Sequence, residues 1–431
     1  MEARRDQCPN LEQPMEIRRD RYLDKLVKRQ NNGMVKVITG VRRCGKSYLL
    51  FRLFKNHLIK EGVLPEHIIE IALDDISNKK LRNADLLYRQ IKGRLAGHSI
   101  HYIFLDEIQF VDGFSDVVNG LLHIPNLDIY VTGSNSRLLS SDALTEFRGR
   151  GDEVRVYPLC FSEYASAYNG STGHAWKDYY TFGGMPLVIS REGDDMKADY
   201  LAHLFKEVYL RDIYERNRIR HEADLDTLVD ILASSVGSLT NPPKLQRSFK
   251  SKRNSTITGK TIKTYINHLE NAFLLESAQR YNVKGRNYIG SPHKYYFVDV
   301  GLRNARLGFR QQEENHIMEN VIYNELRIRG YSVDVGVVDI TETNAKGGRQ
   351  QKRLEIDFIA RRGSDQCYIQ SAFAIGSHVK EAQEKRSLKK VPDSFRKYVI
   401  VKDDIKTKRD ESGIVTMGLF DFLLNRDCLN L

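Results

Sequence analysis

Short apolar runs alternate with amphipathic stretches along the first third of the chain. The runs are rich in Val, Ile, Leu, Tyr and Phe, and they lie at 34–40, 67–73, 101–107, 128–134 and 153–159. The connections are long enough for helices, and residues 46–61 carry a helical pattern. Near-continuous apolar strands joined by helices predict a parallel sheet covered on both faces. We therefore expect an α/β core over residues 1–161.

The pattern changes three times after this core. Residues 162–218 are helical in pattern, apart from a turn at 182–186, and predict a lid or linker. In residues 219–308, two helical stretches separated by Pro242-Pro243 precede strand-like runs, an order typical of a winged-helix module. Residues 309–431 open with a helical stretch and continue with strand-like runs and a further helix. This last part predicts a separate α/β domain.

Composition narrows the class of protein. The 431 residues are 41% hydrophobic and 29% charged, a balance that suits a globular chain and excludes a mostly disordered one. No apolar run reaches the roughly 18 residues of a membrane helix, and the N-terminus lacks the apolar stretch of a signal peptide. We therefore expect a cytoplasmic protein without membrane contact. The five scattered cysteines favour neither a disulfide framework nor a zinc knuckle, and the net charge of +11 favours a polyanionic partner.

A glycine-rich loop follows the first predicted strand. GVRRCGKS matches the motif G-x-x-x-x-G-K-[ST] between a strand and a helix. Glycines let the backbone curl so that its N–H groups point at phosphate oxygens, and the following helix adds its positive end. We expect the Lys46 ammonium to reach the β- and γ-phosphates of ATP and the Ser47 hydroxyl to ligate Mg²⁺. The predicted nucleotide-binding residues are Gly40, Val41, Arg42, Arg43, Cys44, Gly45, Lys46, Ser47 and Tyr48.

Polar residues end the next strands of the predicted sheet. The run YIFL leads into Asp106 and Glu107, and DIYVTG leads into Ser134 and Asn135. In a parallel sheet the carboxyl ends of neighbouring strands face one crevice. We expect Asp106 to hold Mg²⁺ and Glu107 to polarise the attacking water. Ser134 or Asn135 is expected to contact the γ-phosphate or that water, unless the pair forms a simple turn.

A glycine-flanked arginine follows in the run FRGRG. An exposed guanidinium offered to a neighbouring subunit would stabilise charge on the transferring phosphoryl group. Arg150 is the first candidate for this role and Arg148 the second. The alternative is a solvated surface loop.

An ordered set of runs extends this pattern over nearly the whole chain. The set is EIRRDRYLDKL, VITGVRRCGKSYLL, IFLDEIQ, VTGSNSRLLS, VYPLCFSEY and YYTFGGMP, then KTIKTYINHLENAFLL, KYYFVDVGLRN, ENVIYNELRIRGYSV, LEIDFIA and YIQSAF. It resembles the prokaryotic AAA-superfamily ATPases that carry a C-terminal winged helix and a restriction-endonuclease-like domain. The resemblance implies a Walker A loop at 40–47, Walker B acids at Asp106 and Glu107, a sensor at Ser134 and Asn135, and an arginine at Arg150. It also implies an ATP-driven homo-oligomer, with a hexamer as the family-based expectation.

The middle domain contains a stretch in which every charged residue is basic. Residues 241–263 contain no Asp or Glu, and a predicted helix at 259–272 begins inside the stretch. Helix-turn-helix readers place the exposed side of such a helix in the major groove, with flanking cations on phosphates. The candidates for contact with DNA or RNA are Lys250, Lys252, Arg253, Lys260 and Lys263. A basic loop on a winged helix that contacts protein is the alternative.

The C-terminal domain carries an incomplete nuclease pattern. Restriction-type nucleases need a helix Glu, then an Asp, then (D/E)-x-K on the next strand. Glu319 and Asp357 supply the first two, but Gln370 and Ala372 stand where an acid and a lysine are needed. Lys385 or Arg386 on the next helix are the candidates to replace that lysine in space. We therefore predict a domain that does not cut, in which Glu319, Asp357 and Gln370 are a degenerate site.

Three functions fit these patterns. The first is a Mg²⁺-dependent, oligomeric ATPase that acts on nucleic acid or a nucleoprotein partner. The second is a signalling switch that holds ATP and binds a protein partner. The third, an ATP-dependent nuclease, is disfavoured by Gln370 and Ala372. Stimulation of ATP turnover by a polymer separates the first function from the second.

Overall fold

The computed structural model describes residues 16–134, 147, 149–253, 257–343 and 348–430. Its first part holds a five-stranded sheet in the order β2-β3-β4-β1-β5. The strands are β1 (Val35–Thr39), β2 (Ile68–Ala72), β3 (His101–Asp106), β4 (Leu127–Gly133) and β5 (Gly151–Arg155). All four neighbouring pairs are parallel, which confirms the predicted parallel sheet. The last strand is shorter than predicted and ends before residue 156.

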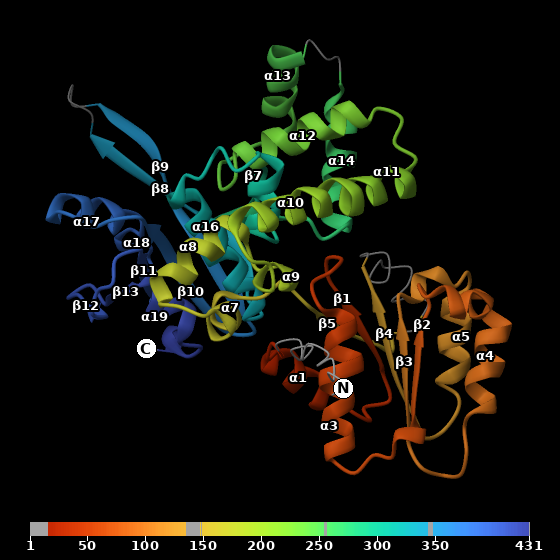
Figure 1. Cartoon of the computed structure of the whole chain (residues 1–431). Coiled ribbons are helices and arrows are strands. Elements are labelled where there is room, and N and C mark those ends of the chain that lie inside the picture. The colour runs from red at the N-terminus through yellow and green to blue at the C-terminus, as the bar shows by residue number, and fades with distance from the viewer. Residues whose placement is uncertain (1–15, 135–146, 148, 254–256, 344–347, 431) are drawn as a thin grey trace, which may run out of the picture.

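Alternate side chains of these strands enter two hydrophobic layers. Val35, Ile103 and Val131 pack under helices α4 (Ala84–Gly93) and α5 (Phe114–Leu121). Phe104 and Tyr130 face the other layer. That layer includes α1 (Asp20–Val27) and the continuous helical stretch α2 (Lys46–Tyr48), η1 (Leu49–Phe54) and α3 (Lys55–Lys60). The sheet is therefore covered on both faces, as Figure 1 shows.

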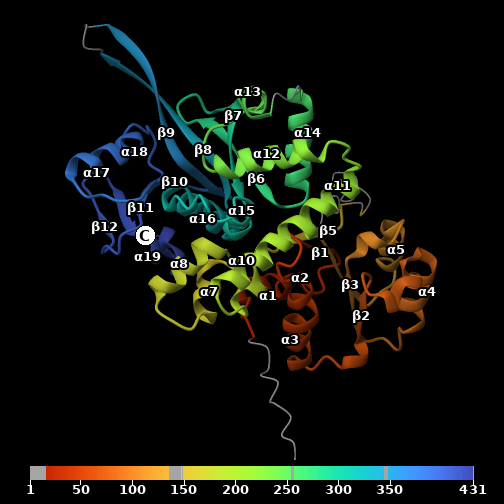
Figure 2. The same cartoon turned by 45° about the horizontal axis from the view of Figure 1, so that its top comes forward.

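A set of helices lies between this sheet and a second one (Figures 1 and 2). These helices are α7 (Phe161–Ala167), α8 (Thr172–Phe182), α9 (Pro186–Ile189), α10 (Asp194–His203), the π-helical η6 (Leu204–Leu210) and α11 (Arg211–Asn217). Helix α10, η6 and α11 follow one another without a break. Residues 194–217 therefore form one long helical element within the predicted helical region, and this element leads toward the helices that follow.

Three further helices lead into a β-ribbon. They are α12 (Glu222–Ser234), α13 (Pro242–Arg253) and α14 (Gly259–Asn271), and the ribbon is β6 (Leu275–Asn282) and β7 (Asn287–Phe297). The sequence indicated a break at Pro242-Pro243, whereas the structure begins helix α13 there. Proline suits a first helical turn, because the N–H groups at that position have no partner within the helix. The winged-helix assignment stays a prediction.

The second sheet is mixed and has the order β12-β13-β11-β10-β9-β8-β6-β7. Its later strands are β8 (Ser332–Thr343), β9 (Arg349–Arg362), β10 (Asp365–Ala372), β11 (Arg396–Val401), β12 (Lys408–Arg409) and β13 (Ile414–Gly418). The helices of this part are α15 (Val300–Arg306), α16 (Glu314–Ile328), α17 (His378–Glu384), α18 (Arg386–Lys389) and α19 (Leu419–Leu424). Strand β6 pairs with β8 in parallel, so the ribbon and the C-terminal strands share one sheet across residue 308. The restriction-endonuclease-like assignment stays a prediction.

Candidate functional site

The glycine-rich loop leaves the carboxyl end of β1 and enters α2. A Cβ atom at Gly40, where φ is 144°, would lie 2.0 Å from the carbonyl oxygen of Val156. Gly45 has φ of 98°, a second conformation that favours glycine. The buried Lys46 ammonium donates to the carbonyl oxygens of Gly40 at 3.0 Å and Val41 at 3.1 Å. The loop thus curls around the Lys46 cation.

The predicted metal ligands meet at the ends of neighbouring elements. The Ser47 hydroxyl donates to Asp106 Oδ2 at 2.7 Å, and the Thr132 hydroxyl donates to Asp106 Oδ1. Burial raises the pKa of Asp106, and the charge of Glu107 adds to the increase, although the two hydroxyl donors oppose it. Thr132 was not among the predicted residues. The order of strands β3 and β4 in the sheet is the signal that would have identified it.

Glu107 lies in a polar contact network of its own. Its backbone has φ of 52°, an unusual value for a residue other than glycine, and its N–H donates to the Thr132 hydroxyl at 3.0 Å. Ser134 donates to the Glu107 carboxylate at 3.2 Å, and Gln109 donates to the same oxygen. The structure therefore brings Ser134 and Glu107 together, while Asn135 lies outside the described residues.

A cleft of about 1300 Å³ opens between this loop and the helical segment. Predicted residues on its wall include Arg42, Arg43, Tyr48 and, deeper, Asp106 and Glu107. Val41 and Cys44 are instead buried in the hydrophobic core behind the loop. Residues that the sequence analysis did not select also line the cleft, namely Ile17, Arg19, Pro186, Leu187, Ile189, Glu207 and Val208. Of these, Ile17 and Arg19 lie in the run EIRRDRYLDKL and Pro186 ends the run YYTFGGMP, whereas Leu187, Ile189, Glu207 and Val208 lie in none of the runs quoted above.

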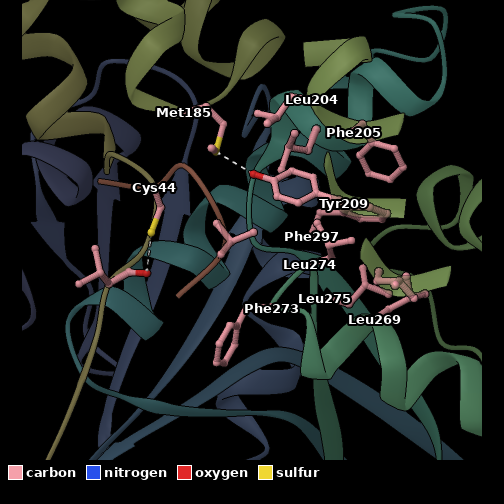
Figure 3. Close-up of a cluster of buried hydrophobic side chains, with 14 of the residues drawn as sticks. Cys44, Met185, Leu204, Phe205, Tyr209, Leu269, Phe273, Leu274, Leu275 and Phe297 are labelled. Carbon is pink, nitrogen blue, oxygen red and sulfur yellow. Dashed lines mark hydrogen bonds between the residues drawn. The ribbon is translucent and has the colours of Figure 1, made fainter. Parts of the chain in front are cut away.

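Two buried side chains from other parts of the chain bind backbone carbonyl groups of the loop. The buried Arg19 guanidinium donates to the carbonyl oxygens of Cys44 at 3.1 Å and Tyr157 at 2.6 Å, and it pairs with Glu163. Tyr209, on η6, donates to the carbonyl oxygen of Arg42 at 2.7 Å. Figure 3 shows the Tyr209 hydroxyl next to Met185 in a cluster that includes Cys44 and continues to Leu269 of α14.

The helical segment also holds the loop through charge. Asp212, on α11, pairs with the Arg42 guanidinium at 3.4 Å and with Arg216 at 2.7 Å. The glycine-rich loop therefore contacts η6 through the backbone carbonyl of Arg42 and α11 through the Arg42 side chain.

Arg150 lies where strands β1 and β5 begin, at the end of the first sheet opposite the glycine-rich loop. Its carbonyl oxygen accepts a hydrogen bond from the N–H of Val35, the first residue of β1, at 2.8 Å, and its side chain is exposed. The glycine-rich loop follows the last residue of the same strand. Arg150 is therefore separated from the cleft of its own chain by the length of β1. Arg148 lies outside the described residues.

The candidate nucleic-acid contacts lie on α13 and α14. Lys250, Lys260 and Lys263 are exposed, whereas Ile262, Ile266 and Leu269 are buried, so the core-facing stripe predicted for α14 is confirmed. Thr258 begins α14 by accepting a hydrogen bond from the N–H of Thr261 at 3.2 Å. Lys252 and Arg253 belong to α13, but their side chains lie outside the described residues.

The structure brings the three degenerate-site residues together. Gln370 donates to Asp357 Oδ2 at 2.7 Å, and Glu319 faces the same place from α16. Ala372 is buried at the end of β10. The suggested replacement lysine is wrong, because Lys385 pairs with Glu381 and Asp410 instead, and Arg386 pairs with Glu342. Another cation, Lys294 of β7, lies at the site.

Neither a metal cluster nor a membrane-spanning helix is present among the described residues. Within those residues, no group of three or more His, Cys, Asp or Glu side chains is arranged to hold a metal ion. No helix in the same part of the chain combines the length and the apolar character that a membrane crossing requires.

Two family models match parts of the chain. Residues 32–165 match the family described as AAA domain, and residues 173–313 match a domain of unknown function (DUF8612). A Walker-type ATPase of Pyrococcus abyssi is similar in structure, with 16% identity, a TM-score of 0.48, and coverage of 68% of this chain and 96% of that chain.

Two relatives are similar over most of the sequence. An uncharacterized protein of Methanocaldococcus jannaschii is 28% identical, covering 83% of this chain and 79% of its own length. An uncharacterized protein of Haemophilus influenzae is 32% identical over 414 residues, which are 95% of this chain and 98% of its own length. The chain therefore belongs to the family of that Haemophilus influenzae protein, and its residues 32–165 form an AAA-type domain.

Proposed function

We propose that the chain is a Mg²⁺-dependent ATPase that works as an oligomer on nucleic acid or a nucleoprotein partner. One observation carries the ATPase part of this proposal. Lys46 and Ser47 come from α2, Asp106 ends β3 and Glu107 follows it, and all four line one cleft at the carboxyl edge of a parallel sheet. Ligands of such sheets bind at this edge.

The chemistry of the Ser47 and Asp106 side chains supports a Mg²⁺ ion. Mg²⁺ prefers oxygen ligands, and these two side chains place a hydroxyl and a carboxylate oxygen 2.7 Å apart. Asp106 is buried, and among the described residues its carboxylate binds the Ser47 and Thr132 hydroxyls and not a basic side chain. A buried carboxylate without a cation is costly, so a cation at this position would stabilise it. When bound, Mg²⁺ would neutralise charge on the phosphate oxygens.

The other residues of the cleft have separate roles in the proposed reaction. Lys46 would exchange its two loop carbonyl partners for phosphate oxygens, and the loop N–H groups would orient the phosphates. Glu107 would accept a hydrogen bond from the attacking water and align it. Replacing Lys46 by Ala should abolish ATP binding in an equilibrium titration with a fluorescent ATP analogue. Unchanged affinity would remove the basis of the proposal.

The position of Arg150 supports an oligomer. Its exposed side chain starts from the end of the sheet opposite its own cleft. From there we expect it to act on a nucleotide held by a second copy. We assign it to stabilising charge on the transferring phosphoryl group in that neighbouring copy.

The surface of α13 and α14 supports a nucleic-acid partner. Lys250, Lys260 and Lys263 are exposed on a segment without acidic residues. Each phosphate contact adds about 0.9 to the slope of log K against log salt for duplex DNA. Replacing Lys260 and Lys263 by Ala should therefore lower that slope by about 1.8. The control pair Lys389 and Lys390, exposed on and after α18, should leave it unchanged, and a wild type without a slope would contradict the partner assignment.

One contact favours the second candidate function, an ATP-held switch. Glu107 Oε2 accepts hydrogen bonds from Ser134 and Gln109, and these occupy one oxygen of the carboxylate that would align water. If this contact keeps hydrolysis slow, Gln109→Leu should raise the steady-state turnover without changing ATP affinity. A lower turnover would show instead that Gln109 positions Glu107 for the reaction.

A further inference from the structure

A buried ammonium lies among the acids of the C-terminal sheet. Lys294 Nζ lies 2.9 Å from Glu319 Oε1, 2.9 Å from Glu355 Oε1 and 3.4 Å from Asp357 Oδ1. The Lys294 side chain is 4% exposed. Lys294 belongs to β7, Glu319 to α16, and Glu355 and Asp357 to β9. One cation therefore contacts acids from two different elements.

Neutral donors complete this cluster. The Tyr296 hydroxyl donates to Glu319 Oε1 at 2.7 Å. Gln370 Nε2 and the N–H of Ser371 donate to Asp357 Oδ2 at 2.7 and 2.9 Å. Burial alone would lower the pKa of Lys294, but attraction to Asp357, Glu319 and Glu355 outweighs burial and raises it. Lys294 therefore stays charged, and its charge is shared by three carboxylates.

The geometry does not fit the divalent ion that the resemblance to restriction-type nucleases implies. Mg²⁺ requires oxygen ligands at about 2.0–2.1 Å in octahedral order. Here the acids surround a nitrogen at hydrogen-bond distances, and Gln370 turns its amide N–H₂ toward Asp357. The Gln370 carbonyl oxygen is buried and accepts no hydrogen bond from Lys294 or from any other group among the described residues. A second cation would be repelled by Lys294 at this short range.

We propose that Lys294 is the resident cation of this acidic cluster, taking the place of a metal ion and fastening β7 to α16 and β9. Strand β7 is the last strand at its edge of the sheet and belongs to residues 173–313, whereas its acidic partners follow residue 313. The acids that would hold the metal ion of a nuclease thus bind a side chain from residues 173–313 instead. The C-terminal α/β part acts as a metal-free scaffold for the middle helices.

A Mn²⁺ titration of the full chain without nucleotide tests the exclusion of metal. Every sample carries Asp106→Asn, so that the proposed Mg²⁺ position of the ATPase cleft does not contribute, and free Mn²⁺ is followed by electron paramagnetic resonance. We expect the same Mn²⁺ binding with and without Asp357→Asn, and the same with and without Glu355→Gln. A Mn²⁺ site that either second substitution abolishes would overturn the proposal.

Thermal unfolding tests the fastening role. Lys294→Met keeps the length of the side chain but leaves three acids without their cation, so Tm should fall by roughly 5 °C or more. Lys352→Met, on the exposed part of β9, is the matched control and should leave Tm unchanged. Equal Tm values for the two variants would overturn the role of Lys294. If Lys294→Met does not fold, the Mn²⁺ comparison still decides, because it retains Lys294.

Discussion

Tyr209→Phe removes one hydrogen bond, which joins η6 to the glycine-rich loop. The substitution removes only the hydroxyl that donates to the carbonyl oxygen of Arg42 at 2.7 Å, in a buried part of the core. A hydrogen bond of this kind contributes about 1 kcal/mol net. If this hydrogen bond holds the loop in the shape that binds phosphates, the variant loop reaches that shape only at a cost of the same free energy. ATP binding then weakens by that amount. The dissociation constant for ATP should then rise about fivefold.

The assay is a titration with a fluorescent ATP analogue and Mg²⁺. The chain offers a matched control, because Tyr200 lies on the same continuous helical stretch and its buried hydroxyl has no hydrogen-bond partner among the described residues. Tyr200→Phe should leave the dissociation constant unchanged. The reasoning is refuted if Tyr209→Phe binds ATP as tightly as wild type, or if both variants lose affinity equally.

Two further predictions concern distant parts of the chain. Arg150→Ala should leave ATP affinity unchanged and reduce turnover only at protein concentrations where the chain assembles; loss of binding in the titration would contradict a role in a neighbouring copy. Burial raises the pKa of Asp299 from 3.8 to about 6, although the N–H groups of Gly184 and Leu302 oppose the shift. The folded state then holds this proton more tightly than the unfolded state. The free energy of unfolding should therefore fall by about 3 kcal/mol as the pH rises from about 4 to about 6. Asp299→Asn should remove that part of the pH dependence in urea unfolding, and an unchanged slope would contradict the assignment.

The sequence predicted the parts of the site that short motifs determine. The glycine-rich loop and the acids at Asp106 and Glu107 each follow an apolar strand, and the parallel sheet brings them together. Thr132 and Gln109 contact these acids and lie in the runs VTGSNSRLLS and IFLDEIQ, yet neither was assigned a role from the sequence. Their roles depend on strand order and on a local turn, which single-sequence patterns do not determine.

Long-range contacts account for most of what sequence reasoning missed. Arg19 and Tyr209 contact the loop from other parts of the chain; Arg19 lies in the run EIRRDRYLDKL, but no sequence pattern shows that it reaches the loop, and Tyr209 lies in no such run. For the missing nuclease lysine, the sequence indicates only neighbours in the chain, Lys385 and Arg386 on the next helix. The ammonium comes from Lys294 instead, because β7 and β9 belong to the same sheet.

Steady-state ATP hydrolysis tests the central claim most directly. Wild type and Glu107→Gln should be compared with and without duplex and single-stranded nucleic acid, after a titration has shown that both bind ATP. The proposed function predicts that the polymer stimulates wild-type turnover several-fold and that Glu107→Gln loses this turnover while it still binds ATP. Normal turnover by Glu107→Gln would contradict the assignment of the water-aligning residue, and wild-type turnover indifferent to every polymer would contradict a nucleic-acid-coupled ATPase.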